Sequence, residues 1–380
     1  MKVTLSRQCF SAALARTSGI ADRKSSMQIL SNVLVSTEGD DRVRFAATDL
    51  SLSAEGLFPA RVDKDGAVTL PARTLHDVVK NMPDGPITLN VDGDAVEVTA
   101  GRTRFRLLSL PADDFPTIPD AAEVSFFDVK EKHLAGMIDR CAYSISSDET
   151  RPHINGALFQ GDGKILRMVT TDGHRLSKVE CRVQESGFYN FNMVIPQKGI
   201  LEIRRLLGDS EDTVSIGSLD GSVFLKRKVE VEKATDDQPA VTADVCLSSK
   251  LIETEFPPYD QVIPKQQEKR MIVPRGKLLD ALKRVSIVSS DRTLGVKFVL
   301  SEGAVEIVTD NPSIGGSSDV VDVSYDGADM EIGFNAKYFI DVLSVLNDEE
   351  VAVELSGDLD PAVVKDTAGE FVGVVMPMRI

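Results

Sequence analysis

One pattern occurs three times along this chain, and it constrains the fold more than any other feature of the sequence. A threonine-aspartate pair ends a short β-branched segment near the middle of each third, at Asp49, Asp172 and Asp310. These aspartates lie 123 and 138 residues apart, which is the size of a small domain. An internal repeat of this length predicts three similar domains in the 380 residues rather than one large core.

The segments around each threonine-aspartate pair follow the same order. Apolar residues spaced by three and four positions predict six helices, at 5–19, 72–82, 130–145, 197–207, 275–289 and 335–346. Short β-branched segments, separated by turn pairs such as Asp220-Gly221, predict strands before and after each helix. Each third is therefore expected to hold two strand-helix-strands units, which is an α+β fold. Proline-rich joints predict domains at 1–120, 121–264 and 265–380, with an insertion near 226–244.

The charge of the chain is unevenly distributed. The sequence has 43 basic and 59 acidic residues and a formal net charge of −16, which by itself argues against a nucleic-acid partner. The six expected helices nevertheless carry 15 basic and 6 acidic residues over 80 positions, so they are net +9 and the other 300 positions are −25. If the helices share one side of the sheets, that side would attract DNA phosphates. Ordinary solvated helix faces give the same pattern, so both interpretations stay open.

No set of residues in the sequence predicts catalysis. His174 follows Asp172 in TDGHRL, but the corresponding segment of the first third, TDLSL, has no histidine. The sequence has no phosphate-binding glycine loop, no nucleophile elbow and no histidines at metal-ligand spacing. Its four dispersed cysteines and the absence of a long apolar run fit a protein of a reducing cytoplasm. We therefore expect a non-catalytic, cytoplasmic protein that needs no cofactor and no metal.

Four segments together resemble the bacterial DNA polymerase III beta subunits, the sliding clamps. They are TDGHRL at 171–176, FPPYDQVIP at 256–264, EIGFNAKYFIDVL at 331–343 and VVMPMRI at 374–380. The resemblance covers essentially the whole chain, and it implies three DNA-clamp domains in a head-to-tail homodimer that forms a closed ring around duplex DNA. The ring would tether the replicative DNA polymerase, the clamp loader and other replication and repair proteins that carry clamp-binding peptides. DNA contact would be independent of sequence, and no membrane is involved.

The resemblance also implies three sets of functional residues. A partner-peptide site between the second and third domains would comprise Arg151, Ile154, Thr171, Gly173, His174, Arg175, Leu176, Pro257, Val262, Asn335, Tyr338, Val375, Met376, Pro377, Met378 and Arg379. DNA would be contacted by Lys24, Arg73, Lys80, Lys198, Arg204, Arg205, Lys277, Lys283 and Arg284. The dimer would close where one chain contributes Phe105 and Leu107 and the other contributes Ile287 and Val288. Gln261 and Thr293 depart from the residues common in relatives, so the edge of the peptide site is expected to differ here.

A second function, from a different class, fits the same residues. A clamp-like acidic scaffold would bind peptides without being loaded on DNA. The net charge of +9 on the expected helices favours the clamp. Retention on circular DNA, followed by release when the circle is cut, separates the two functions.

Overall fold

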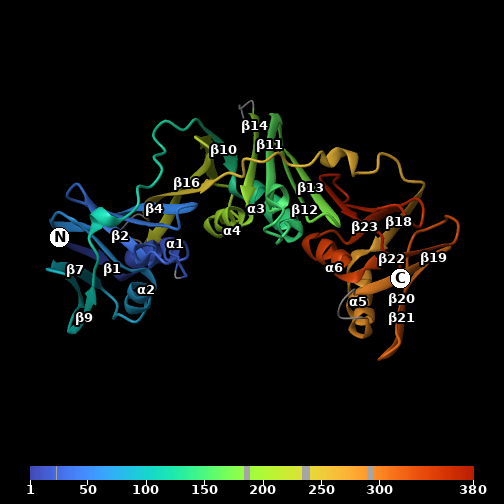
Figure 1. Ribbon diagram of the computed structural model, residues 1–380, viewed down its shortest axis with the longest axis horizontal. Coiled ribbons are helices and arrows are strands. Elements are labelled where there is room, and N and C mark those ends of the chain that lie inside the picture. The colour runs from blue at the N-terminus through green and yellow to red at the C-terminus, as the bar shows by residue number, and fades with distance from the viewer. Residues whose placement is uncertain (23, 184–188, 233–239, 290–293) are drawn as a thin grey trace. The chain divides into compact units, whose positions relative to one another are not determined.

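The computed structural model describes residues 1–22, 24–183, 189–232, 240–289 and 294–380. The chain forms two compact units, which we call unit 1 (Met1–Glu131 with Arg205–Leu251) and unit 2 (Lys132–Arg204 with Ile252–Ile380). Six repeats, each of one strand, one helix and three further strands, follow one another along the described chain (Figure 1). The α+β class and the order of elements predicted from the sequence are confirmed.

The first third of the chain contains the first two repeats and one short additional strand, β5 (Arg61–Lys64). The first repeat consists of β1 (Lys2–Ser6), α1 (Arg7–Thr17), β2 (Asn32–Glu38), β3 (Arg42–Thr48) and β4 (Leu52–Pro59). The second consists of β6 (Ala67–Pro71), α2 (Ala72–Lys80), β7 (Pro86–Asp92), β8 (Ala95–Ala100) and β9 (Thr103–Leu108).

The middle third contains the third and fourth repeats. The third consists of β10 (Phe126–Lys130), α3 (Glu131–Cys141), β11 (Gly156–Gly163), β12 (Ile165–Thr171) and β13 (Arg175–Arg182). The fourth consists of β14 (Tyr189–Pro196), α4 (Gln197–Leu206), β15 (Thr213–Leu219), β16 (Ser222–Glu232) and β17 (Val241–Lys250).

The last third contains the fifth and sixth repeats. The fifth consists of β18 (Lys269–Pro274), α5 (Arg275–Val285), β19 (Gly295–Ser301), β20 (Ala304–Asn311) and β21 (Gly315–Asp322). The sixth consists of β22 (Met330–Asn335), α6 (Ala336–Val345), β23 (Glu350–Leu355), β24 (Ala362–Lys365) and β25 (Phe371–Val375).

All six helices occur where apolar spacing predicted them, but they are shorter than expected. The Ser6 hydroxyl accepts a hydrogen bond from the backbone N–H of Cys9 and so starts α1 one residue after β1 ends. The Asn335 side chain starts α6 in the same way by accepting from Lys337 N. At their carboxyl ends, α3 and α5 tighten into the 3-10 turns η3 (Ala142–Ser144) and η6 (Ser286–Val288).

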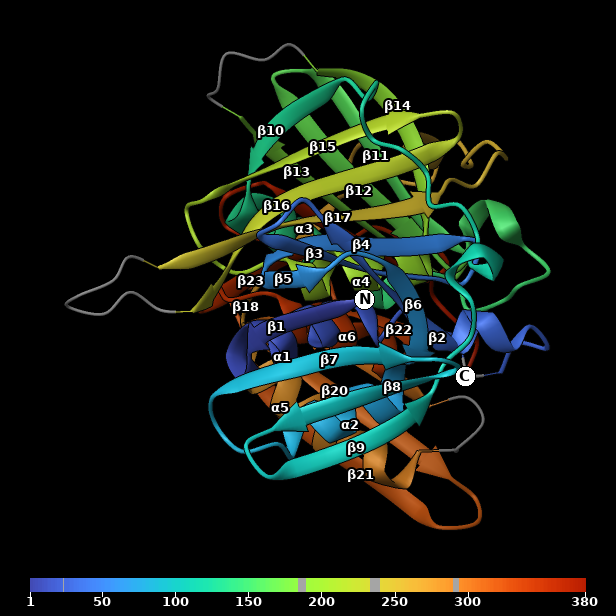
Figure 2. The same ribbon diagram turned by 90° about the vertical axis from the view of Figure 1, so that its left-hand side faces the viewer.

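Four antiparallel sheets carry the described strands. The five-stranded sheet has the order β5-β1-β7-β8-β9, and the four-stranded sheet has the order β21-β20-β19-β22. The first eight-stranded sheet, β10-β15-β16-β17-β4-β3-β2-β6, belongs to unit 1, and Figure 2 shows its strands side by side. The second eight-stranded sheet, β14-β11-β12-β13-β25-β24-β23-β18, belongs to unit 2.

The two joints between thirds of the chain follow one rule. In the first eight-stranded sheet, β4 of the first repeat pairs with β17 of the fourth. In the second, β13 of the third repeat pairs with β25 of the sixth. In each joint, therefore, the last strand of one repeat pairs with the last strand of the repeat that comes three places later in the chain. The last strands of the second and fifth repeats, β9 and β21, are edge strands with a pairing partner on one side within the described chain.

The stretch 226–244, suggested as an insertion, is largely sheet. Lys226 pairs with Cys246 and Val229 with Ala243, so β16 and β17 extend through most of it. Residues 233–239, at the end of this hairpin, lie outside the described residues. The predicted turn at Asp220-Gly221 is present, with φ of 49° and 69° at its two residues. No helix in the part of the chain that the structure describes is long and apolar enough to cross a membrane.

Candidate functional site

One aspartate organises the turn that joins β12 to β13. Asp172 Oδ1 accepts hydrogen bonds from the backbone N–H groups of His174 and Arg175, at 2.9 and 3.1 Å. Asp172 Oδ2 lies 2.9 Å from Arg175 Nε. Gly173 between them has a φ of 90°, a conformation that favours glycine. Because both oxygens of Asp172 are engaged in holding the turn, the geometry gives this carboxylate a structural role and not that of a partner for a catalytic imidazole.

Arg175 anchors this turn to the two neighbouring helical segments. Its side chain is 8% exposed, and Nη1 lies 2.6 Å from Asp341 Oδ2 of α6. Nη2 donates to the backbone carbonyl of Tyr143 in η3 at 2.8 Å. The guanidinium carbon lies 5.1 and 4.7 Å from the ring centroids of Tyr143 and Tyr338. Burial alone would lower the pKa of Arg175, but the bonds with Asp341 and Asp172 outweigh burial and raise it.

A cavity of about 360 Å³ in unit 2 lies beside this turn, and we call it the apolar cavity. Leu176 of β13 and Val374 of β25 stand opposite each other in register and form its floor. Both belong to a buried cluster that continues into Leu158 and Val169. The polar side chains of Arg151, Thr171 and Arg175 lie at the border of the cavity. An apolar cavity with a few polar groups at its border is typical of a binding site for short peptides or small ligands.

The proline-rich segment after β17 supplies another wall of the apolar cavity. Ile252 N donates to Val194 O at 2.9 Å and fixes the start of this segment on β14. Tyr259, at the start of η5 (Tyr259–Gln261), is 7% exposed, and its hydroxyl donates to Gln160 Oε1 at 3.1 Å. Burial raises the pKa of Tyr259, so its hydroxyl stays a donor at neutral pH. Val262 follows on the surface, where it is 46% exposed.

The C-terminal tail, residues 376–380, completes the border of the cavity. Met376 N donates to His174 O at 2.9 Å, so the tail continues the pairing of β25 beyond its last residue. The Met376 side chain lines the cavity and is 37% exposed. A flexible thioether at the entrance can adapt to apolar ligands of different shape.

Nine of the sixteen residues that the resemblance assigned to the peptide site line the apolar cavity. They are Arg151, Ile154, Thr171, Gly173, Arg175, Leu176, Pro257, Val262 and Met376. His174 instead lines a neighbouring polar cavity of about 480 Å³, and its ring stacks on Tyr338 at a centroid distance of 6.3 Å. Asn335 caps α6, and Val375 is fully buried. Pro377, Met378 and Arg379 extend past the cavity along the tail.

Four residues that line the apolar cavity were not expected. They are His153, Phe256, Tyr259 and Val374. Strand alternation could have identified Val374, because Met376 faces the cavity and the residue two positions earlier faces the same side. Val375, between them, faces the opposite side. The other three lie in 3-10 turns or in the irregular segment before β18, where no periodicity gives a signal.

The nine basic residues expected to contact DNA are unequal in their surroundings. Lys24, Arg73, Lys80, Lys198, Arg205, Lys277, Lys283 and Arg284 are exposed, whereas Arg204 is half-buried. Arg204 Nε lies 2.7 Å from Asp139 Oδ1, and Arg284 Nη2 lies 2.6 Å from Asp319 Oδ2. Arg73 lies 3.8 Å from Asp77 one helical turn away. These three arginines have carboxylate neighbours that would compete with a phosphate.

The edge strands β9 and β21 expose apolar side chains. Phe105 of β9 is 38% exposed, and Val320 of β21 is 59% exposed. Ile287, which is 77% exposed, lies in η6, and η6 packs against β21. The interface residues Leu107 and Val288 are half-buried. Exposed apolar edge strands are open to pairing with another chain, and the sequence prediction had not identified β21 as one of them.

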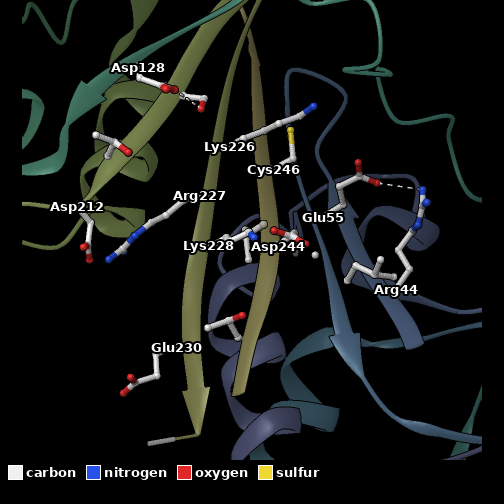
Figure 3. Close-up of a pocket in the computed structure, with 16 residues that line it drawn as sticks. Arg44, Glu55, Asp128, Asp212, Lys226, Arg227, Lys228, Glu230, Asp244 and Cys246 are labelled. Carbon is white, nitrogen blue, oxygen red and sulfur yellow. Dashed lines mark hydrogen bonds and ion pairs between the residues drawn. The ribbon is translucent and has the colours of Figure 1, made fainter. Parts of the chain in front are cut away.

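A third hollow, of about 840 Å³, lies on the first eight-stranded sheet and has a mixed lining (Figure 3). Arg44 Nη1 lies 3.3 Å from Glu55 Oε2, and Lys226 lies 4.4 Å above the ring of Phe126. Cys246 lies beside Lys226, but burial raises its pKa to about 12, so little thiolate forms at neutral pH. Across the described ranges, no group of three or more His, Cys, Asp or Glu side chains could hold a metal ion.

Comparison with known proteins places this chain in a family. The beta sliding clamp of Pseudomonas aeruginosa is 33% identical over 383 residues, which cover all of both chains. This chain belongs to the beta sliding clamp family. Models of the N-terminal, central and C-terminal domains of the DNA polymerase III beta subunit match residues 1–119, 128–258 and 260–379 of this clamp. The beta sliding clamp of Caulobacter vibrioides is also 33% identical over 388 residues and is covered in full.

Solved structures agree with this assignment over the whole clamp. The crystal structure of the DNA polymerase III subunit beta from Pseudomonas aeruginosa matches with a TM-score of 0.91 at 32% identity, and each chain covers the other completely. A structure of the same sliding clamp bound to griselimycin matches with a TM-score of 0.90. The resemblance stated from sequence is confirmed. The family is that of a clamp subunit of DNA polymerase III and not of a catalytic enzyme, as the sequence predicted.

Proposed function

We propose that this clamp is a processivity factor whose two copies close head to tail into a ring around duplex DNA in the cytoplasm. The observation that carries the ring is the pair of edge strands, β9 and β21. Within the chain, last strands pair between the first and fourth repeats and between the third and sixth. The described part of each chain has six repeats, so three places after the fifth repeat comes the second repeat of another copy. The same rule therefore pairs β21 with β9 of that copy.

The two edges have complementary side chains for such a joint. β9 presents exposed Arg106, and β21 presents exposed Asp322. Leu108, two residues after Arg106, and Val320, two residues before Asp322, supply exposed apolar surface on the same faces as these charges. Opposite charges across a strand pair fix its register, and apolar side chains between them contribute most of the stability. Phe105, Leu107, Ile287 and Val288 are the residues that we assign to this interface.

In the proposed ring, basic residues of the helices contact the DNA backbone without reading its sequence. Phosphates attract lysine and arginine irrespective of base, so such contacts hold the duplex without specifying a sequence. The decisive experiment loads the protein on nicked circular DNA with its clamp loader and then cuts the circle. We expect retention on the circle and release after cutting. Binding to partner peptides without any retention on circles would instead identify an acidic scaffold.

We also propose that the apolar cavity captures the clamp-binding peptides of the polymerase, the clamp loader and repair proteins. Leu176, Val374 and Met376 would receive aliphatic and aromatic anchors, where most binding energy is expected. Clamps from Pseudomonas aeruginosa and Bartonella birtlesii have been solved bound to griselimycin, which supports a ligand site on this fold. Gln261 is exposed at the end of η5 beside this cavity, whereas Thr293 lies outside the described residues.

Deleting residues 376–380 tests the peptide site. The deletion removes the Met376 wall but leaves β25 intact, so the variant should remain a dimer and lose affinity for a fluorescent peptide carrying a glutamine and apolar anchors. His174→Ala should still bind, because His174 contributes its carbonyl to the tail and its ring to a stack. Undiminished affinity in the deletion variant would place the partner site elsewhere.

A further inference from the structure

The C-terminal tail spans two sheets of unit 2. At one end Met376 N donates to His174 O beside the second eight-stranded sheet, and at the other Met378 N donates to Gly333 O at 2.9 Å. Gly333 lies in β22, the edge strand of the four-stranded sheet whose other side pairs with β19. In an extended segment, the N–H groups of residues two apart point to the same side. The N–H groups of Met376 and Met378 therefore point to the same side of the tail, and each donates to a different sheet. Pro377, which lies between these two residues, has no N–H group on the opposite side.

Gly333 fits this arrangement because it has no side chain. A Cβ at this position would clash with the Met378 carbonyl oxygen and would lie 2.7 and 2.8 Å from two side-chain carbons of Ile380. The first of these is a backbone atom, so the clash cannot be relieved by a side-chain rotation. The φ angle of Gly333 is not positive, so the backbone conformation of β22 at this position would also accept alanine. It is the tail, and not the conformation of β22, that requires glycine here.

We propose that Gly333 is a positioning residue for the peptide site. Because Gly333 has no side chain, the C-terminal tail can pack directly against β22, and the tail in turn holds Met376 at the entrance of the apolar cavity. The inference rests on the proposed peptide function, since the tail matters for binding only if the cavity is the peptide site. Gly333 does not line the cavity, and it acts on the cavity through Met378 and Met376. An added methyl group at position 333 displaces the tail and removes one wall of the cavity.

The test compares Gly333→Ala with Gly136→Ala, using the full-length protein and a fluorescein-labelled peptide with a glutamine followed by aliphatic and aromatic anchors. Gly136 lies in α3 of the same unit, and a Cβ there meets nothing within 4 Å. We expect Gly333→Ala to weaken peptide affinity by about tenfold or more, the usual effect of losing one contact at a binding hot spot. The Gly136→Ala control should bind as the wild type does. Wild-type affinity in Gly333→Ala overturns the proposal.

A truncation separates tail seating from general damage to β22. A chain ending at Pro377 lacks both groups that the new methyl would strike, so Gly333→Ala should cause no further loss of affinity in that background. An equal loss in the full-length and truncated chains would show that alanine disturbs β22 itself, and would overturn the proposal. Hydrogen exchange at the Met378 amide gives a second readout, which is independent of peptide binding. We expect Gly333→Ala to abolish its protection, and full protection would contradict tail displacement.

The same measurements distinguish this inference from the function on which it rests. If the wild-type protein fails to bind the peptide while Gly333→Ala still frees the Met378 amide, the proposed peptide site is wrong and the seating of the tail stands. If the wild type binds and Gly333→Ala changes neither affinity nor exchange, the peptide site stands and the role of Gly333 is wrong.

Discussion

Replacing Arg175 by methionine tests whether the turn beside the apolar cavity depends on one buried cation. Methionine keeps most of the length and apolar contact while removing the charge. The Arg175 side chain is 8% exposed, and its partners Asp172 and Asp341 are 19% and 20% exposed. Breaking a buried ion pair by removing one partner costs about 3–5 kcal/mol, because the other charge is left uncompensated. Since water reaches both carboxylates, we expect the lower limit, about 3 kcal/mol in the free energy of unfolding.

Tyrosine fluorescence during urea unfolding measures this loss in the relevant part of the molecule. The chain has no tryptophan and five tyrosines, all of which belong to unit 2: Tyr143, Tyr189, Tyr259, Tyr325 and Tyr338. Two of them lie within 5.1 Å of the Arg175 guanidinium. With a denaturant slope of about 3 kcal/mol per molar urea, the expected loss lowers the unfolding midpoint by about 1 M.

Arg270→Met in the same unit is the matched control. Arg270 is 67% exposed and lies 4.0 Å from Glu354, so its removal should cost about 0.5 kcal/mol or less. Adding Asp341→Asn to Arg175→Met should recover little of the loss, because Lys337 Nζ lies 3.1 Å from Asp341 Oδ2 and still compensates that carboxylate. A midpoint for Arg175→Met as close to the wild type as that of the control would refute the reasoning.

Three further predictions concern assembly, DNA and the thiols. Ile287→Ala combined with Val288→Ala should weaken the dimer, since truncating a buried aliphatic side chain costs roughly 1–4 kcal/mol, and an unchanged dimer in mass photometry at nanomolar concentration would place the interface elsewhere. Lys283→Glu on α5 should lower the slope of log affinity for DNA against log salt by about one. Lys228→Glu on β16 serves as its control, and equal slopes in both variants would argue against a helix-borne DNA surface. At pH 8, Cys9, Cys141 and Cys246 of the native protein should each react with iodoacetamide on the order of a thousand times more slowly than in urea, because burial raises the pKa of these three thiols to about 12. Peptide mapping locates the label, and fast labelling of any of the three in the native protein would contradict this.

The repeat structure could be predicted from sequence because it depends on local signals. Helix periodicity and turn pairs are visible within short windows, and all six helices form where they indicated. The helix ends could not be predicted as well, since they depend on a capping Ser6 or a tightening at η6. The pairing of β4 with β17 joins residues far apart along the chain. No periodicity specifies such a partner, so the division into two compact units was not foreseen.

The candidate site shows the same division between local and distant causes. Leu176 and Met376 were assigned by resemblance, and strand alternation from Met376 leads to Val374. Tyr259 could not be predicted in this way, because a 3-10 turn places it in the cavity. Gly333 carries no local signal at all, since its requirement arises from a backbone that passes over it from another part of the sequence.

The strand joints of this clamp differ in one respect, which is whether the polypeptide connects the two partners. β4 with β17, and β13 with β25, belong to one chain, so each pair closes at an effective concentration in the millimolar range set by the connecting segments. β9 and β21 of separate copies would meet at the bulk concentration of the protein. Dilution therefore discriminates among three chemically similar joints by mass action. It opens the joint between copies and leaves the two within each chain closed, so the ring would separate into whole folded chains.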